Sequence, residues 1–185
     1  MRDEEGLTVD LQVPNVEVTG ALRRLFAQFL DDGLHGSDRA LALCRALLAG
    51  EGAAFEALLG DLLLTVTSYH GTARGQAEAV YQAFVAGLLV RLDETHLVST
   101  NREAGYGRVD VLVCPRQHGG VGVVLELKTL DRRRGETPER ALAAALRQLQ
   151  ERDYAAGLRG RGAGAVHQLG AVFDGKRAWV GVGGV

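Results

Sequence analysis

The stretch Gly107-Arg108-Val109-Asp110, with Glu126-Leu127-Lys128 further along the chain, decides the fold. Both lie in apolar segments, Val109 to Cys114 and Val121 to Leu127, separated by residues rich in glycine, with a proline and a histidine. Short apolar runs bounded by turn residues are typical of buried β-strands. The sequence therefore predicts two adjacent strands that carry charged residues in an otherwise apolar setting.

Three charged residues interrupt these strands, namely Asp110, Glu126 and Lys128. Side chains alternate along a strand, so Glu126 and Lys128 face the same way, with the Leu127 carbonyl beside them. Buried carboxylates and ammonium groups cost free energy unless they are paired or bind a metal. Mg²⁺ takes oxygen ligands, few of them from protein. We therefore expect Asp110, Glu126 and the Leu127 carbonyl to hold Mg²⁺ or Mn²⁺, with Lys128 orienting a water or neutralising phosphate charge.

At these residues the chain resembles the PD-(D/E)XK nuclease superfamily, whose signature is an acid on one strand and (D/E)-x-K on the next. Val109 stands where the signature has proline. The segment from Thr100 to Asp110 is similar to a branch of prokaryotic proteins in which the nuclease-like domain follows an AAA-type ATPase-like domain. The other segments that share the resemblance are Val13 to Val18, Tyr69-His70, Glu78 to Leu89, Gln148 with Tyr154, and Leu169 to Lys176.

The resemblance implies a restriction-endonuclease-like α/β fold, with a central mixed sheet of four to five strands flanked by helices. We expect a small N-terminal strand and helical extension over residues 1–66 and the nuclease-like domain over 67–185. The implied activity is metal-dependent hydrolysis of phosphodiester bonds, above all in DNA, with Asp110, Glu126 and Lys128 as catalytic residues. Glu78, on the helix before the sheet, is expected to assist them. A favourable charge near a helix N-terminus is the alternative role for Glu78.

The expected contacts with nucleic acid are basic and polar residues around this site. Arginine binds phosphate well, yet the chain has a net charge of −2, which is unfavourable for tight binding to duplex DNA. Relatives of the RecB type carry a Gln-x-x-x-Tyr element near the DNA; Gln150 fits it by spacing and Gln148 by similarity to the specific branch, and the choice stays open. The candidates are Arg102, Arg108, Arg132, Arg133, Arg134, Gln148, Gln150 and Tyr154.

Hydrophobic periodicity and turn residues predict the remaining elements. The expected helices cover 16–30, 37–48, 53–64, 75–92 and 138–158. The expected further strands cover 8–13, 95–100, 165–173 and 177–182. A polar turn is expected from Asn101 to Gly107, and Thr137 followed by Pro138 is a favourable start for the long helix.

Other features bound the function. The polar N-terminus has no apolar signal segment, and Cys44 and Cys114 lie in apolar segments, so we expect a cytoplasmic protein with reduced thiols. No phosphate-binding Gly-x-x-x-x-Gly-Lys-Ser/Thr motif occurs, so an ATPase activity would belong to a partner domain or protein. Whether the protein forms a homodimer is left open by the sequence. The alternatives to a DNA nuclease are a catalytically inactive nuclease-fold module working with an ATPase, or an RNA-cleaving enzyme.

Overall fold

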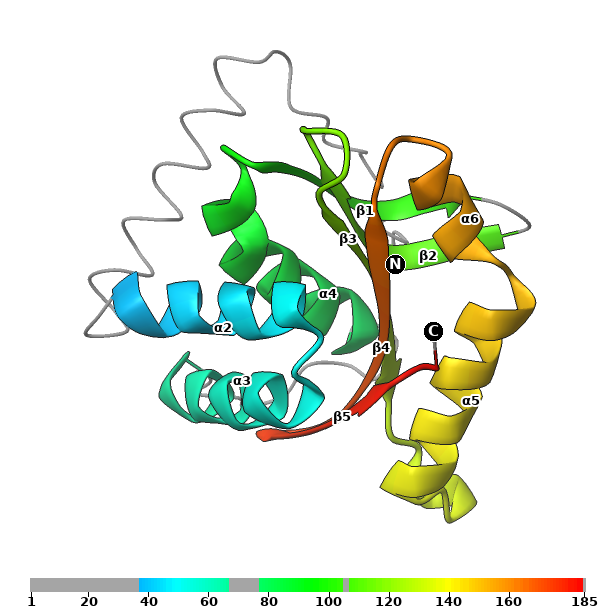
Figure 1. The fold of residues 1–185 in the computed structure, drawn as a ribbon. Helices are drawn as coiled ribbons and strands as arrows, with labels where there is room; N and C mark the ends of the chain where they lie inside the picture. The colour runs from blue at the N-terminus through cyan, green and yellow to red at the C-terminus, as the bar shows by residue number, and fades with distance from the viewer. Residues whose placement is uncertain (1–36, 67–76, 105–106, 185) are drawn as a thin grey trace, which may run out of the picture.

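The computed structural model describes residues 37–66, 77–104 and 107–184 of the 185-residue chain (Figure 1). The strand expected at 8–13, the helix expected at 16–30 and the Tyr69-His70 pair lie outside these residues. No helix within the described ranges is both long and apolar enough to cross a membrane. Cys44 and Cys114 are free cysteines, as expected.

A five-stranded mixed sheet in the order β1-β2-β3-β4-β5 forms the centre of the molecule, which confirms the predicted fold class. Neighbouring strands run antiparallel except for β3 and β4, which are parallel. The parallel pair is the central one, with strands on both sides. The strands are β1 (His96–Ala104), β2 (Gly107–Pro115), β3 (Val121–Thr129), β4 (Ala165–Asp174) and β5 (Arg177–Val182).

Helices cover both faces of the sheet, as Figure 1 shows. One face carries α2 (Ser37–Ala49), α3 (Gly52–Val66) and α4 (Ala77–Leu88), which continues into the 3₁₀ turn η1 (Leu89–Leu92). The other face carries α5 (Pro138–Glu151) and α6 (Tyr154–Arg159), preceded by the 3₁₀ turn η2 (Arg132–Arg134). The long connection between the parallel strands β3 and β4 therefore contains helices, as parallel pairing requires.

Each face of the sheet has its own buried apolar cluster. Phe55 and Leu59 of α3 share a cluster with Val111 of β2 and Leu125 of β3. On the other face, Leu112 and Val124 pack with residues of α5 and α6. Because α2 and α3 bury their apolar side chains in the same cluster as the sheet, they pack on the nuclease-like part. The predicted domain limit at residue 66 stays a prediction.

Two predicted boundaries were wrong. The turn expected from Asn101 is shorter, because β1 continues to Ala104 and pairs with β2 as far as Ala104 and Gly107. Pairing with β2 keeps this polar segment extended, and β1 is an edge strand of the sheet, where polar residues are tolerated.

The helix expected over 138–158 is two helices. Asp153 adopts a left-handed conformation with φ 43°, and its carboxylate accepts a hydrogen bond from the Ala156 N–H at 3.4 Å, which starts α6. Aspartate tolerates this conformation better than most residues. Gln150 and Tyr154 therefore lie on different helices, so their spacing does not place them on one helical face. Thr137 caps α5 as expected, accepting from the Arg140 N–H.

Two paired glycines let α5 approach the sheet closely. Gly170 of β4 is paired with Gly181 of β5. A Cβ at Gly170 would lie 3.0 Å from the Ala145 Cβ, and one at Gly181 would lie 2.9 Å from a Leu142 methyl group. Gly170 is also the parallel-sheet partner of Glu126, so this close packing sets how α5 lies beside that carboxylate.

We predict that Gly170→Ala destabilises the protein by about 1–3 kcal/mol, because the added methyl group overpacks the contact with Ala145. Gly60→Ala is the matched control. A Cβ at Gly60, inside α3, meets nothing within 4 Å, so that variant is expected to gain about 0.5–1 kcal/mol. Urea denaturation followed by circular dichroism measures both. Equal stability of the two variants would contradict the close contact of α5 with β4.

Candidate active site

The pairing of β2 with β3 ends immediately before the acidic residues. Its last pair is Val111 with Leu125, and the same register continued by one residue would bring Asp110 opposite Glu126. Val109 and Leu112, three residues apart, both lie in the cluster under α5 and α6, whereas a regular strand returns to one face every second residue. The backbone of β2 is therefore irregular at the position of Asp110.

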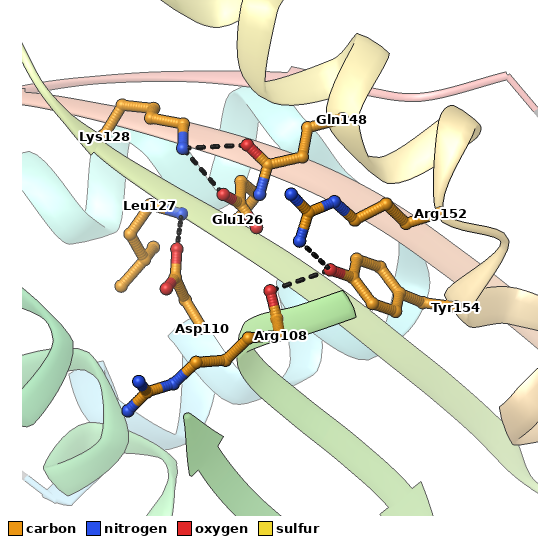
Figure 2. A network of polar contacts seen from close by, with 8 residues as sticks. All are labelled: Arg108, Asp110, Glu126, Leu127, Lys128, Gln148, Arg152 and Tyr154. Carbon is orange, nitrogen blue, oxygen red and sulfur yellow. Dashed lines mark hydrogen bonds and ion pairs between the residues drawn. The ribbon is translucent and has the colours of Figure 1, made fainter. Parts of the chain in front are cut away.

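In this irregular region Asp110 accepts hydrogen bonds with both its side chain and its backbone carbonyl. Its Oδ2 accepts a hydrogen bond from the Leu127 N–H of β3 at 2.8 Å, so the carboxylate takes the place of a backbone carbonyl of β2 as the ladder acceptor (Figure 2). Its backbone carbonyl accepts a hydrogen bond from the Gln82 side chain of α4 at 2.9 Å. The carboxylate is thereby held against the residue that follows Glu126.

Glu126 and Lys128 lie on the same side of β3, as the alternation of the strand predicts. The Lys128 Nζ donates to Glu126 Oε1 at 2.8 Å and to Gln148 Oε1 of α5 at 3.0 Å (Figure 2). Only 2% of the Glu126 side chain is exposed, against 30% for Lys128. The ammonium thus offsets the cost of the buried carboxylate while it keeps contact with solvent.

The sequence left open whether Gln148 or Gln150 is the glutamine of the Gln-x-x-x-Tyr element, and the structure places the two differently. Gln148 is partly buried and contacts Lys128, whereas Gln150 is exposed. Tyr154 is fully buried, and its hydroxyl donates to the Arg108 carbonyl at 2.7 Å, which ties α6 to β2. The Arg152 guanidinium lies 3.5 Å from the same hydroxyl (Figure 2). Contact of these side chains with nucleic acid stays a prediction.

The predicted arginines differ in what they contact. Arg132 forms an ion pair with Asp174 at the β4–β5 hairpin, and Arg134 forms one with Asp131 at 3.5 Å. Arg133 is exposed. These three residues therefore form a short 3₁₀ turn directly after β3, with part of their charge neutralised by aspartates.

Three further predicted residues belong to β2, β1 and α4. Arg108 is exposed on β2, and its side chain extends away from the Lys128–Gln148 pair (Figure 2). Arg102 belongs to β1 and Glu78 to the first turn of α4, but their side chains lie outside what the structure describes. Glu78 is one helical turn before Gln82, the residue that binds the Asp110 carbonyl. Sequence reasoning missed Gln82; the signal was a polar residue within the apolar segment of this helix.

Electrostatics at Asp110 favour a bound cation. Burial raises the pKa of Asp110, while the Leu127 N–H, Lys128 and Arg108 act in the opposite direction without cancelling the effect. A carboxylate that is partly desolvated in this way gains free energy from a cation placed beside it.

The comparison with known proteins agrees with this geometry. A family model described as the PD-(D/E)XK nuclease superfamily matches residues 76–182, which include all five strands. The chain belongs to this superfamily. No curated protein and no solved structure matches the chain. The predicted membership is confirmed, and the acid on β2 with Glu-Leu-Lys on β3 supplies the two halves of the superfamily signature.

The donor set suits the divalent metal that PD-(D/E)XK nucleases typically use. Asp110, Glu126 and the Leu127 carbonyl would supply oxygen ligands, which Mg²⁺ and Mn²⁺ prefer. Within the described residues, no group of three or more His, Cys, Asp or Glu side chains gathers into a metal site. Mg²⁺ completes its octahedral shell with waters and phosphate oxygens, so two carboxylates and a carbonyl are compatible with it.

We predict that Asp110→Asn stabilises the metal-free protein at pH 7. The asparagine side-chain oxygen still accepts from the Leu127 N–H, and no partly buried charge remains. Because the folded-state pKa of Asp110 is raised above 3.8, its ionisation destabilises the folded state at neutral pH. The advantage of the variant should shrink as the pH falls through the folded pKa towards 3.8.

Urea denaturation in EDTA at a series of pH values measures this effect. Glu94→Gln, at an exposed carboxylate, is the control for the loss of one negative charge. A stability gain equal to that of the control, or one that grows on acidification, would contradict the assignment.

Proposed function

We propose that this PD-(D/E)XK protein is a Mg²⁺- or Mn²⁺-dependent nuclease that hydrolyses phosphodiester bonds in DNA. The observation that carries the proposal is the arrangement of Asp110, Glu126 and Lys128 on β2 and β3. Asp110 is held against the Leu127 N–H, and Lys128 is paired with the nearly inaccessible Glu126. An inactive scaffold has no use for three charged groups that cost free energy in this position.

Asp110, Glu126 and the Leu127 carbonyl would hold the metal ion. When bound, such an ion neutralises phosphate charge and makes a coordinated water more acidic. Glu78 is proposed to assist from the first turn of α4. In the overall reaction a water oxygen forms a bond to phosphorus and the bond from phosphorus to O3′ breaks. One proton leaves the water and one reaches O3′, which yields a 3′-hydroxyl and a 5′-phosphate.

Lys128 is best suited to act as a charged donor. Its ammonium is held between Glu126 Oε1 and Gln148 Oε1. An ammonium fixed in this way can position the attacking water and stabilise charge that develops on the phosphate oxygens. Gln148 is therefore proposed to position Lys128.

Arginines around the site are proposed to contact the nucleic acid backbone. Arg108 and Arg133 are exposed, and Arg132 and Arg134 share the turn after β3 with Arg133. Arg102 is also proposed to contact the backbone, because it lies on β1 opposite Val109. Such contacts carry no base specificity, and the net charge of −2 favours modest affinity unless a partner helps. An AAA-type ATPase domain or protein is the proposed partner, and the cytoplasm the proposed location.

We predict cleavage that requires a divalent cation and the acidic residues. Single- and double-stranded DNA and RNA are incubated with Mg²⁺, Mn²⁺ or EDTA, and products are resolved by electrophoresis. DNA should be cleaved with either metal and not in EDTA. Asp110→Asn and Glu126→Gln should each lower the rate by about a thousandfold, the equivalent of several kcal/mol of transition-state stabilisation.

Each alternative to a DNA nuclease has its own outcome in this assay. Cleavage of RNA alone would identify the protein as a ribonuclease. Binding of nucleic acid without cleavage of any substrate would favour the inactive module.

We predict that Gln148→Met lowers kcat by about 10–100-fold, the range found when a residue that orients a catalytic group is removed. KM should change little, because Gln148 acts through Lys128 in this proposal. Gln117→Met, in the exposed turn after β2, is the control. A raised KM with unchanged kcat would instead assign Gln148 to nucleic-acid binding.

A further inference from the structure

Gln82 of α4 is a nearly buried polar residue that the signature of the superfamily does not include. Only 8% of the Gln82 surface is exposed. The side-chain Nε2 donates a hydrogen bond to the Asp110 carbonyl at 2.9 Å. A buried amide must find hydrogen-bond partners or it costs free energy, so its partner is a fixed feature of the packing. One such partner is the backbone carbonyl of Asp110, the proposed metal ligand.

The Asp110 backbone lies at a position that neither neighbouring strand pairs in the ladder. The β2–β3 ladder ends at Val111 with Leu125. In the β1–β2 ladder, the pair Thr100 with Val111 is followed by Arg102 with Val109; the register is unchanged, but the ladder skips the position at which Asn101 stands opposite Asp110. The Gln82 amide therefore holds a carbonyl at a break in the regular sheet.

We infer that Gln82 is a positioning residue that fixes Asp110 for metal binding, an inference that rests on the proposed function for its catalytic consequence. With the carbonyl held by Gln82 and Oδ2 held by the Leu127 N–H, Asp110 is fixed at both ends. Glu78 lies one turn earlier on α4. The same hydrogen bond therefore links the helix that carries this proposed catalytic residue to the strand that carries the proposed ligand.

Loss of the Gln82 hydrogen bond on α4 is expected to affect β3, because Asp110 bonds to both elements. If the Gln82 hydrogen bond is removed, the irregular segment of β2 loses its link to α4. The carboxylate should then occupy its place beside β3 for less of the time, and the Leu127 N–H should lose its acceptor. Leu125, two residues earlier and paired with Val111, should keep its ladder contacts.

Amide hydrogen exchange measured by NMR on the metal-free full chain tests the inference without any need for activity. Gln82→Met removes the donor at similar volume, and Gln82→Glu keeps the length and polarity while it replaces the donating amide with an acceptor. Should the first variant fail to fold, the second still provides the test. Gln117→Met, at the far end of the β2–β3 hairpin, is the matched control.

We expect the Leu127 amide to exchange about three- to tenfold faster in the Gln82 variants, the effect of losing one typical hydrogen bond. The Leu125 amide should be unchanged, and the control should match the wild type at both positions. Unchanged exchange at Leu127, or equal acceleration at Leu125 and Leu127, would overturn the inference, since the second pattern means general destabilisation.

Isothermal titration with Mn²⁺ alone separates this inference from the proposed function. We expect the Gln82 variants to bind Mn²⁺ about 10–100-fold more weakly than the wild type. Wild-type affinity in the Gln82 variants would overturn the link between Gln82 and the metal. Faster Leu127 exchange in a protein whose wild type neither binds Mn²⁺ nor cleaves nucleic acid would support the positioning of Asp110 and refute the nuclease proposal.

Discussion

The hydrogen bond from the Leu127 N–H to the Asp110 carboxylate is the interaction on which the arrangement of the site depends. Backbone pairing between β2 and β3 ends at Val111 with Leu125, two residues before Leu127, so the side chain of Asp110 replaces the missing backbone acceptor. An unsatisfied buried N–H is costly, and the carboxylate gains a charge-assisted hydrogen bond in return. The break in the sheet and the fixed acid are thus two aspects of one feature.

Close helix packing completes the site from both faces of the sheet. On one face, Gly170 and Gly181 let α5 lie near β4 and β5, so that Gln148 reaches Lys128 across β3. On the other face, α4 brings Gln82 to the Asp110 carbonyl. The polar groups of the site are therefore supported by elements whose own positions are fixed by apolar packing. Rigid support of this kind is what the precise placement of catalytic groups requires.

Charge at the site is partly compensated within the protein. Lys128 neutralises Glu126 through a short ion pair, whereas Asp110 remains partly desolvated and has a raised pKa. A metal ion would remove this remaining imbalance, and the free energy so gained contributes to its binding. The Asp174 and Asp131 contacts of Arg132 and Arg134 limit the positive potential on the adjacent turn. The chain as a whole has little positive charge to spare, since its net charge is −2.

The sequence by itself determined the fold class, the superfamily and the same-face placement of Glu126 and Lys128. These follow from strand periodicity and from a local signature, which depend on residues close together in the chain. Tertiary structure alone decided that Gln148 contacts Lys128 and Gln150 does not, because the packing of α5 on Gly170 sets which face of this helix meets the sheet. It also decided that Gln82 contacts the Asp110 carbonyl, since a contact between α4 and an irregular point of β2 has no periodic signal in the sequence. Local patterns specify elements and faces, whereas contacts between distant elements depend on how side chains of different size and polarity pack together.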